Sequence, residues 1–241
     1  MAEFLLDSVR VMLGFLLKAL FDPNSAKGLV GEKLTTAGMW LFLDQKVYRR
    51  IDDLIIPSAN GTTQIDHVLV STFGIFVIET KNIQGWIFGN ENDSTWCQSI
   101  YGRKSRFQNP LRQNFRHLQC LAEFLGLDQK LFHSVAFFIG ECEFKTPLPS
   151  NVLASGLSSY VSSIRMQLLT PAQVDEVEQR IREFKAGSGL TKSDHLASLK
   201  RRHSSATLCP KCGGQLVQRT AKRSRKVFLG CSNFPKCRHQ V

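Results

Sequence analysis

Four cysteines near the C-terminus constrain the fold of this chain more than any other feature. They follow the pattern C-x2-C, 18 further residues and C-x5-C, and they are Cys209, Cys212, Cys231 and Cys237. Structural zinc takes four thiolates at tetrahedral corners, and each short-spaced pair supplies two of them. A module this small cannot bury enough apolar surface to fold alone, so metal would supply the missing stability. We expect structural Zn²⁺; the alternative is four buried or redox-active cysteines.

The same end of the chain carries almost all of the excess positive charge. Residues 201–241 hold ten Lys or Arg and no Asp or Glu, whereas the other 200 residues hold 21 basic and 20 acidic side chains. A compact basic patch favours polyanions such as nucleic acid. The alternative is a solvated, solubilising tail. The remaining cysteines, Cys97, Cys120 and Cys142, are scattered singly, which is a poor disulfide framework and indicates a reducing, cytoplasmic compartment.

The cysteine module resembles a known one. The stretches CPxCGGxLVxR and FxGCSNFPxC are similar to the C-terminal zinc ribbon of bacterial type IA topoisomerases, with a short hairpin between the cysteine pairs. The resemblance implies DNA binding, single-stranded at the ribbon. It implies that Phe228 and Phe234 stack on bases, and that phosphates are contacted by Arg219, Arg223, Arg225 and Lys226. The alternative is that both phenylalanines form the small ribbon core. The resemblance covers the ribbon only, so topoisomerase activity is not expected.

Two apolar, β-branched segments in the first half of the chain predict a hairpin. The strands are residues 64–70 and 75–81, joined by the four-residue loop 71–74. This loop would pair Val70 with Ile75 and place Asp66 opposite Glu79. Lys81 would share the face of Glu79, because side chains alternate along a strand. His67 would point the opposite way.

Two opposed carboxylates repel each other unless a cation lies between them. Mg²⁺ or Mn²⁺ is often held by one or two carboxylates together with phosphate oxygens. Lys81 would then orient an attacking water or stabilise charge on phosphorus. The alternative is that Glu79 and Lys81 are an exposed pair and Asp66 is a solvated acid.

Residues 25–145 resemble the nuclease-related (NERD) domain family. The matching elements are Gly31-Glu32, the segments 65–70 and 74–81, Gly85-Trp86, Trp96-Cys-Gln98, and residues 109–114 followed by His117. The family is identified as a member of the PD-(D/E)xK nuclease superfamily, although Ile65 stands where that name implies Pro. The resemblance implies an α/β, restriction-endonuclease-like mixed sheet flanked by helices. It also implies metal-dependent nuclease chemistry with the catalytic residues Asp66, Glu79, Lys81, Glu32 and Gln98.

Helices are predicted on either side of a further strand over residues 131–139. The first begins after the cap Asn109 and ends at Gly126, with a core face of leucines and Phe115. On another face Gln113, Asn114 and His117 would either point toward the site or bind a neighbouring loop. A second helix, capped by Thr170, would run to about residue 185.

The domain organisation follows from these elements. We expect an apolar N-terminal helix (1–24), the nuclease-like domain (25–145), its extension (146–185), a linker with at most a short helix (186–206) and the ribbon (207–241). Residues 4–21 hold three charges, so a helix packed on the domain is favoured over an interfacial membrane helix, and a spanning anchor is least favoured. The expected location is the cytoplasm at the nucleoid, or alternatively the inner membrane. The leading function is a nuclease tethered to DNA; the alternative is an inactive DNA-binding scaffold.

Overall fold

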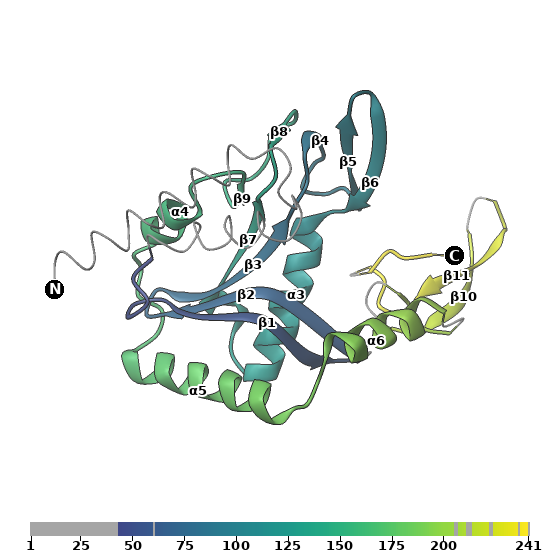
Figure 1. Cartoon of the computed structure of the whole chain (residues 1–241). Coiled ribbons are helices and arrows are strands. Elements are labelled where there is room, and N and C mark those ends of the chain that lie inside the picture. Colours follow the sequence, from purple (N-terminus) through teal and green to yellow (C-terminus); the bar gives the residue numbers. More distant parts are fainter. Residues whose placement is uncertain are drawn as a thin grey trace, which may run out of the picture. The chain divides into compact units, whose positions relative to one another are not determined.

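The computed structural model describes residues 43–59, 61–204, 207–210, 214–221, 224–235 and 237–240. The predictions for the N-terminal helix, Glu32, Cys212 and Arg223 lie outside these residues. The described chain mixes strands and helices, which confirms the predicted α/β class (Figure 1). It forms two compact units. Of the described residues, the larger comprises Gln45–Glu79, Gln108–Ala136 and those from Met166 onward, and the smaller comprises residues 43–44, Thr80–Phe107 and Phe137–Arg165.

A five-stranded sheet has the order β1-β2-β3-β7-β9. Its strands are β1 (Arg49–Ser58), β2 (Gly61–Ser71), β3 (Gly74–Lys81), β7 (Phe132–Phe138) and β9 (Val152–Leu153). The predicted pairing of Val70 with Ile75 is confirmed, and the ladder continues to Ser71 opposite Gly74. The connection is therefore a tight two-residue turn. Gly74 has φ +116°, a conformation that glycine adopts without steric cost.

Helix α3 (Pro110–Leu125) begins and ends as its sequence predicts. Its cap Asn109 accepts a hydrogen bond from the amide of Leu111, and Gly126 adopts the left-handed conformation that ends the helix. Helix α5 (Pro171–Gly187) begins with a capping box between Thr170 and Gln173. Both helices bury their apolar side chains against residues of β1, β2 and β3 in one hydrophobic core. The short helix η1 (Gln129–Leu131) leads from α3 into β7.

One part of the predicted α3 core face is wrong. Leu118, Leu121 and Leu125 are buried, but Phe115 is 51% exposed. The inward positions of the first helical turns are taken by Asn114 and His117, which are buried. A polar pair therefore replaces apolar packing where α3 approaches the centre of the sheet.

The segment predicted as a linker contains helix α6 (Lys192–Ser204), which packs on β2. The hydroxyl of Ser198, a buried residue, accepts a hydrogen bond from the Thr62 amide at 3.1 Å. Arg202 is also buried and donates to the Thr62 carbonyl at 2.9 Å, while a ring nitrogen of His195 lies 2.9 Å from the Thr62 hydroxyl. A side chain at Gly61 would overlap Ser198, so glycine at this position permits the docking of α6.

The smaller unit is built on a four-stranded sheet with the order β6-β5-β4-β8. Its strands are β4 (Gly85–Phe88), β5 (Thr95–Ile100), β6 (Arg103–Gln108) and β8 (Cys142–Phe144), and helix α4 (Leu157–Ser163) follows later in the chain. One face is a cluster of aromatic rings in which Trp96, 1% exposed, stacks with Phe138 at 6.2 Å and meets Phe107 edge-on at 6.3 Å.

The predicted ribbon hairpin is confirmed as β10 (Leu216–Thr220) paired antiparallel with β11 (Val227–Cys231). Within the described residues, no helix is both long enough and apolar enough to cross a membrane.

Candidate active site and zinc ribbon

The register of β2 and β3 determines how the two predicted carboxylates lie. The β2–β3 ladder ends with His67 opposite Ile78. Continued by one residue in the same register, it would place Asp66 opposite Glu79. Asp66 is half-buried and Glu79 is 2% exposed. A buried carboxylate must be compensated by polar partners or by a cation, because the loss of hydration is costly. Carboxylate oxygens are the ligands that hard divalent cations prefer.

Helix α3 places a histidine beside Glu79. Nδ1 of His117 lies 3.3 Å from Oε2 of Glu79, and both side chains are buried. One turn earlier, Nδ2 of Asn114 donates to the carbonyls of Val77 at 2.7 Å and Val135 at 3.0 Å. Asn114 thus ties α3 to the backbones of β3 and β7, which holds His117 against the carboxylate.

His117 is the site residue that reasoning from the sequence left undecided. Its signal was the spacing of three residues from Asn114, which places both side chains on one face of a helix. That spacing does not say which face meets the sheet. Only the packing of α3 on β3 distinguishes a partner of Glu79 from a surface histidine.

Lys81 and Gln98 are the other predicted catalytic residues in the described chain, and they have different neighbours. Lys81 is the last residue of β3, two positions after Glu79, so strand alternation turns both side chains to the same face. Gln98 donates from its amide to the Gln84 carbonyl at 2.8 Å and accepts from the Ser105 hydroxyl at 3.0 Å. Both ends of the Gln98 amide thus brace β5 against its neighbours.

His67 points away from the carboxylate pair, as the alternation of β2 predicts. Its Nδ1 lies 2.7 Å from Oδ1 of Asp52, its partner across β1 and β2. Burial of Asp52 acts to raise its pKa, but the hydrogen bond with His67 and the charges of His67, Arg50 and Lys185 together outweigh burial, so the pKa lies below its ordinary value of 3.8. His67 is therefore engaged by Asp52 across the two strands.

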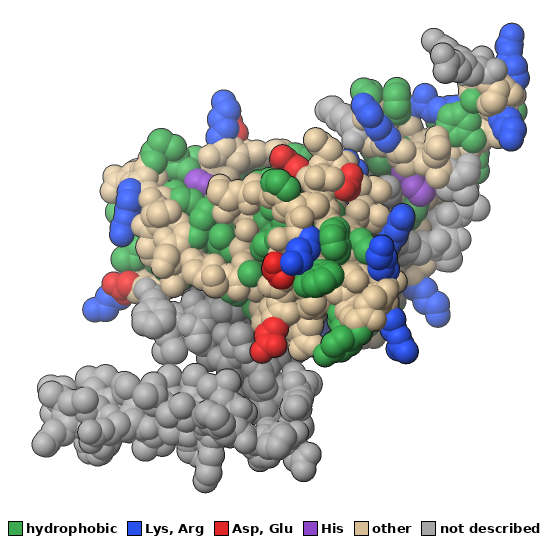
Figure 2. Space-filling model, turned by 90° about the horizontal axis from the view of Figure 1, so that it is seen from above, with side chains coloured by type: hydrophobic (Ala, Val, Ile, Leu, Met, Phe, Trp, Pro, Cys, Tyr) green, Lys and Arg blue, Asp and Glu red, His purple; other side chains and the backbone are tan. Residues whose placement is uncertain are grey.

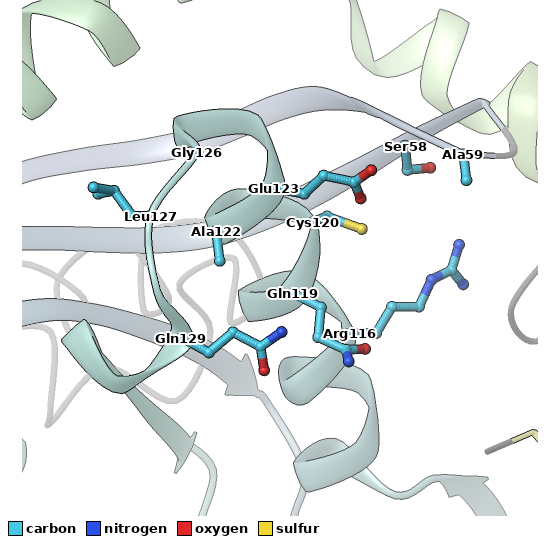
Figure 3. A pocket seen from close by; sticks show the side chains of 10 residues that line it. All are labelled: Ser58, Ala59, Arg116, Gln119, Cys120, Ala122, Glu123, Gly126, Leu127 and Gln129. Atoms are coloured by element: carbon cyan, nitrogen blue, oxygen red, sulfur yellow. The ribbon is translucent and has the colours of Figure 1, made fainter.

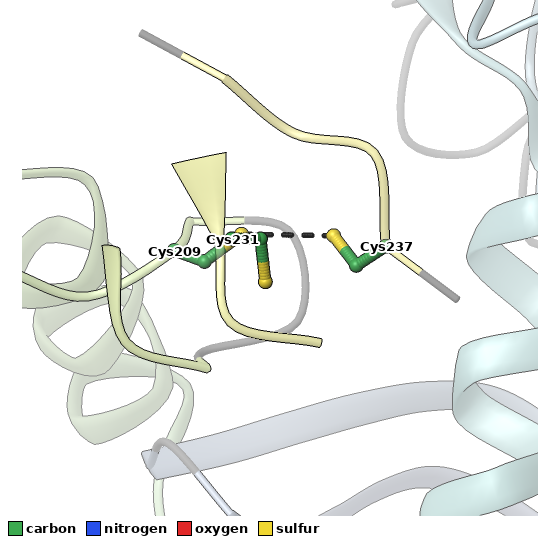
Figure 4. Close-up of side chains that lie close together, drawn as sticks. All are labelled: Cys209, Cys231 and Cys237. Atoms are coloured by element: carbon green, nitrogen blue, oxygen red, sulfur yellow. Dashed lines mark hydrogen bonds between the residues drawn. The ribbon is translucent and has the colours of Figure 1, made fainter. Parts of the chain in front are cut away.

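Three of the four predicted zinc ligands meet in the ribbon (Figure 4). The sulfur atoms of Cys209, Cys231 and Cys237 all lie within 4.8 Å of one another, and those of Cys209 and Cys237 are 3.7 Å apart. Two thiolates on one tetrahedral zinc are separated by about 3.8 Å, from a zinc–sulfur distance of roughly 2.3 Å. The amide of Asn233 donates to the Cys231 sulfur at 3.4 Å, as expected for a thiolate acceptor. The arrangement fits structural Zn²⁺.

Around the ribbon hairpin, the residues expected to bind DNA divide into two kinds. Arg225 and Lys226 are exposed, as phosphate contacts require. Arg219 is half-buried, donates to the Cys231 carbonyl at 3.2 Å, and its guanidinium lies 5.6 Å from the ring centre of Phe234. Phe234 is 57% exposed and Phe228 is half-buried. The geometry therefore favours Phe234 over Phe228 as a stacking surface.

A hollow of about 540 Å³ lies beside α3 (Figure 3). Arg116, Cys120 and Glu123 line it from the helix, and Ser58 and Ala59 line it from the end of β1. Burial raises the pKa of the Cys120 thiol above its ordinary value of 9.0, although the charge of Arg116 opposes this. A thiol that stays protonated is a poor nucleophile. Among the described residues, the predicted catalytic residues Asp66, Glu79, Lys81 and Gln98 do not line this hollow, so its size does not identify the active site.

Known proteins match the two parts of the chain separately. Residues 27–139 match the nuclease-related domain family, and residues 206–241 match the topoisomerase DNA-binding C4 zinc finger family. An uncharacterized protein of Bacillus anthracis is 42% identical over 120 residues, which cover 49% of this chain and 56% of that protein.

DNA topoisomerase 1 of Pyrococcus horikoshii is 59% identical over 29 residues, or 12% of this chain and 4% of the enzyme. The corresponding enzyme of Mycoplasma genitalium is 56% identical over 31 residues, or 13% and 4%. The chain thus spans little more than half of the Bacillus relative and a small part of the topoisomerases. No solved structure gives a significant match.

Proposed function

We propose that this chain, which carries a nuclease-related domain over residues 27–139 and a topoisomerase-type C4 zinc ribbon over residues 206–241, is a metal-dependent nuclease held on DNA by its ribbon. The proposal is supported by the burial of Glu79 and by the β2–β3 register, which ends with His67 opposite Ile78, one residue short of Asp66 and Glu79. A hard divalent cation is the ligand that such a pair selects.

In this proposal Asp66 and Glu79 hold Mg²⁺ or Mn²⁺, and Glu32 is a further acidic residue of the site. The bound cation supplies a Lewis acid for a phosphate oxygen and lowers the pKa of a bound water. Lys81 orients that water and stabilises the negative charge that develops on phosphorus. The water would give up a proton to solvent as its oxygen forms a bond to phosphorus, and the bond to the leaving oxygen would break as that oxygen takes up a proton from solvent. His117 is a positioning residue that fixes the orientation of Glu79.

The ribbon gives this chemistry its substrate. Its exposed Arg225 and Lys226 contact phosphates, and Phe234 stacks on an unpaired base. Binding through one module raises the local concentration of DNA at the other without any new contact in the active site. We place the protein with DNA in the cytoplasm on the same grounds.

The test is cleavage of single- and double-stranded DNA with Mg²⁺ or Mn²⁺ by the wild type and by Lys81→Ala. Loss of one preorganised charge-stabilising group costs roughly 10²–10³-fold in rate. We expect at least that loss at unchanged DNA affinity, with Lys130→Ala, at an exposed lysine outside the site, cleaving as the wild type does.

Two results would contradict the proposal. Equal cleavage by the wild type and Lys81→Ala would mean that the activity arises elsewhere. DNA binding without cleavage by any variant would make the protein a DNA-binding scaffold with a nuclease-like fold.

A further inference from the structure

The outer face of the four-stranded sheet in the smaller unit exposes aromatic side chains that the proposed chemistry does not use. In β4, Trp86 is 53% exposed and Phe88 is 36% exposed, whereas Ile87 between them is fully buried. The opposite face already forms an aromatic core around Trp96. Trp86 and Phe88 are therefore not needed to hold the sheet, and apolar side chains gathered on one exposed face indicate a binding surface.

The register of β5 and β6 shows which residues share this face. Tyr101 and Gly102 form a two-residue turn with positive φ at both positions, which is the usual turn of a twisted hairpin. The hydrogen bond between Ser105 and Gln98 places these two residues opposite each other. Counting from that pair, Lys104 lies opposite Ser99.

The outer face consequently has two rows of side chains across three strands. The pairing of β4 with β5 sets Trp86 opposite Ser99 and Phe88 opposite Cys97. Extended to β6, the rows are Trp86, Ser99 and Lys104 in the first, and Phe88, Cys97 and Arg106 in the second. We name this surface the β4–β6 face. The row of Trp86 therefore ends at Lys104, and the row of Phe88 ends at Arg106.

The β5–β6 hairpin of the β4–β6 face is basic, whereas the connection between β4 and β5 carries the exposed Glu91 and Asp93. Arg103, Lys104 and Arg106 are all exposed, and residues 95–116 contain no Asp or Glu. On the other side, Glu143 is paired by Lys145, whose ammonium also lies 4.6 Å from the ring centre of Trp86. The hairpin ends at Tyr101, a further aromatic side chain that is fully exposed. Figure 2 shows Lys and Arg side chains interspersed with hydrophobic ones on the side of the molecule that it presents.

We propose that the β4–β6 face binds single-stranded DNA, with bases stacked on Trp86 and Phe88 and phosphates on Lys104 and Arg106. Aromatic side chains can stack only on unpaired bases, since a duplex buries the faces of its bases. Two residues apart on a strand, the rings are separated by about 6.7 Å, which successive nucleotides of an extended strand can follow. The cations provide the complementary charge.

This surface is distinct from the zinc ribbon and does not depend on nuclease activity. It would present a single strand whether or not the domain cuts it. Binding is therefore measured without added Mg²⁺ or Mn²⁺, so a failure of the proposed nuclease and a failure of this surface give different results.

The first experiment measures the affinity of the full chain for a 20-nucleotide oligo(dT). Stacking on an aromatic ring contributes roughly 5- to 100-fold per base, so Trp86→Ala with Phe88→Ala should weaken binding at least 10-fold. Phe115→Ala, which removes an exposed ring elsewhere, should leave it unchanged. Lys104→Ala with Arg106→Ala alters only exposed side chains and should lower the slope of log affinity against log salt by about 1.4. The exposed cations Lys130 and Arg165 are the matched control pair.

A second measurement identifies the contact itself. Stacking at this face should quench the fluorescence of Trp86 when oligo(dT) binds, and a Trp86→Phe variant separates this signal from those of Trp40 and Trp96. Trp86→Phe should keep most of the affinity and lose that quench. Wild-type affinity in the double alanine variant, with loss of affinity in Phe234→Ala, would overturn the proposal in favour of the ribbon alone. Tighter binding of oligo(U) or of duplex DNA would overturn the assignment to single-stranded DNA.

Discussion

In the larger unit, β2 and β3 bury most of their side chains between helices and neighbouring strands, and Glu79 and Asn114 are buried with them. In the ribbon, the buried residues among those described are Cys209, Gly230 and Cys231. The first region places its polar groups by packing around an apolar core. The ribbon places its aromatic and basic groups by bringing its cysteine sulfur atoms close together. Loss of a single cysteine ligand should therefore disrupt the whole ribbon. Loss of one contact in the sheet should lower its stability only by the contribution of that contact.

The largest effect is expected from the zinc ligands. Structural zinc contributes roughly 10–16 kcal/mol of apparent binding free energy, which the small ribbon core cannot replace. Cys231→Ser should therefore lose the bound zinc and the protease resistance of the ribbon, while the unfolding transition of the core formed by β1, β2, β3, α3 and α5 stays in place. Metal analysis and limited proteolysis check this, with Cys142→Ser as the control. If Cys231→Ser retained zinc and an intact ribbon, the ribbon would not depend on each single ligand, and it would not differ from the sheet in this respect.

A smaller effect is expected from the polar contact of α3 with the sheet. Asn114→Ala removes three hydrogen bonds from a buried side chain, to Val77, Ser134 and Val135. We expect a loss of about 2–4 kcal/mol in the free energy of unfolding, measured by urea denaturation. The adjacent exposed residue provides the control, and Phe115→Ala should stay within about 0.5 kcal/mol of the wild type. Similar values for both variants would show that Asn114 does not hold α3.

The smallest effect concerns α6, which packs on β2. Burial of His195, and then the positive charges of Arg202, His117 and Arg116, lower the pKa of this histidine below its ordinary value of 6.5. Above pH 6.5 the ring is neutral in both states, so stability is unaffected. As pH falls below 6.5 the unfolded chain takes up a proton that the folded protein resists, and stability declines until the folded pKa is reached.

Hydrogen exchange of α6 at pH 7.5 and pH 5.5 measures this decline. His195→Gln should remove it, because the amide does not titrate and can still bond to the Thr62 hydroxyl. The same pH dependence in His195→Gln would show that His195 is not the responsible group. Exchange of α6 as fast as in an unfolded peptide at both pH values would return residues 192–204 to the status of a linker.

Much of the local structure could be predicted because it depends on neighbours in the sequence. The cap Asn109, the ending at Gly126 and the hairpin register through Val70 and Ile75 all follow from short-range rules. The ribbon hairpin and its cysteine ligands follow from spacing. The roles of Asp66, Glu79 and Lys81 remain predictions, because their placement on strands does not by itself demonstrate chemistry.

Other features could not be predicted because they join distant segments. The contact of His117 with Glu79 spans 38 positions, and the bond of Thr62 with Ser198 spans 136. The exposure of Phe115 and the burial of Asn114 depended on how α3 turns on the sheet. The helical periodicity of apolar residues identifies the apolar face of α3. It does not identify a polar side chain, such as that of Asn114, which is buried because it donates to backbone carbonyls.

By itself, then, the sequence determined the hairpin, the helix ends, the cysteine ligand pattern and the basic character of the C-terminal module. Tertiary structure decided that His117 faces a buried carboxylate, that α6 docks on β2, and that Trp86 and Phe88 share an exposed face with Lys104 and Arg106. The physical reason is one of range. Caps, turns and metal-ligand pairs are satisfied within a few residues, whereas burial and charge complementarity depend on which distant strands and helices the core brings together.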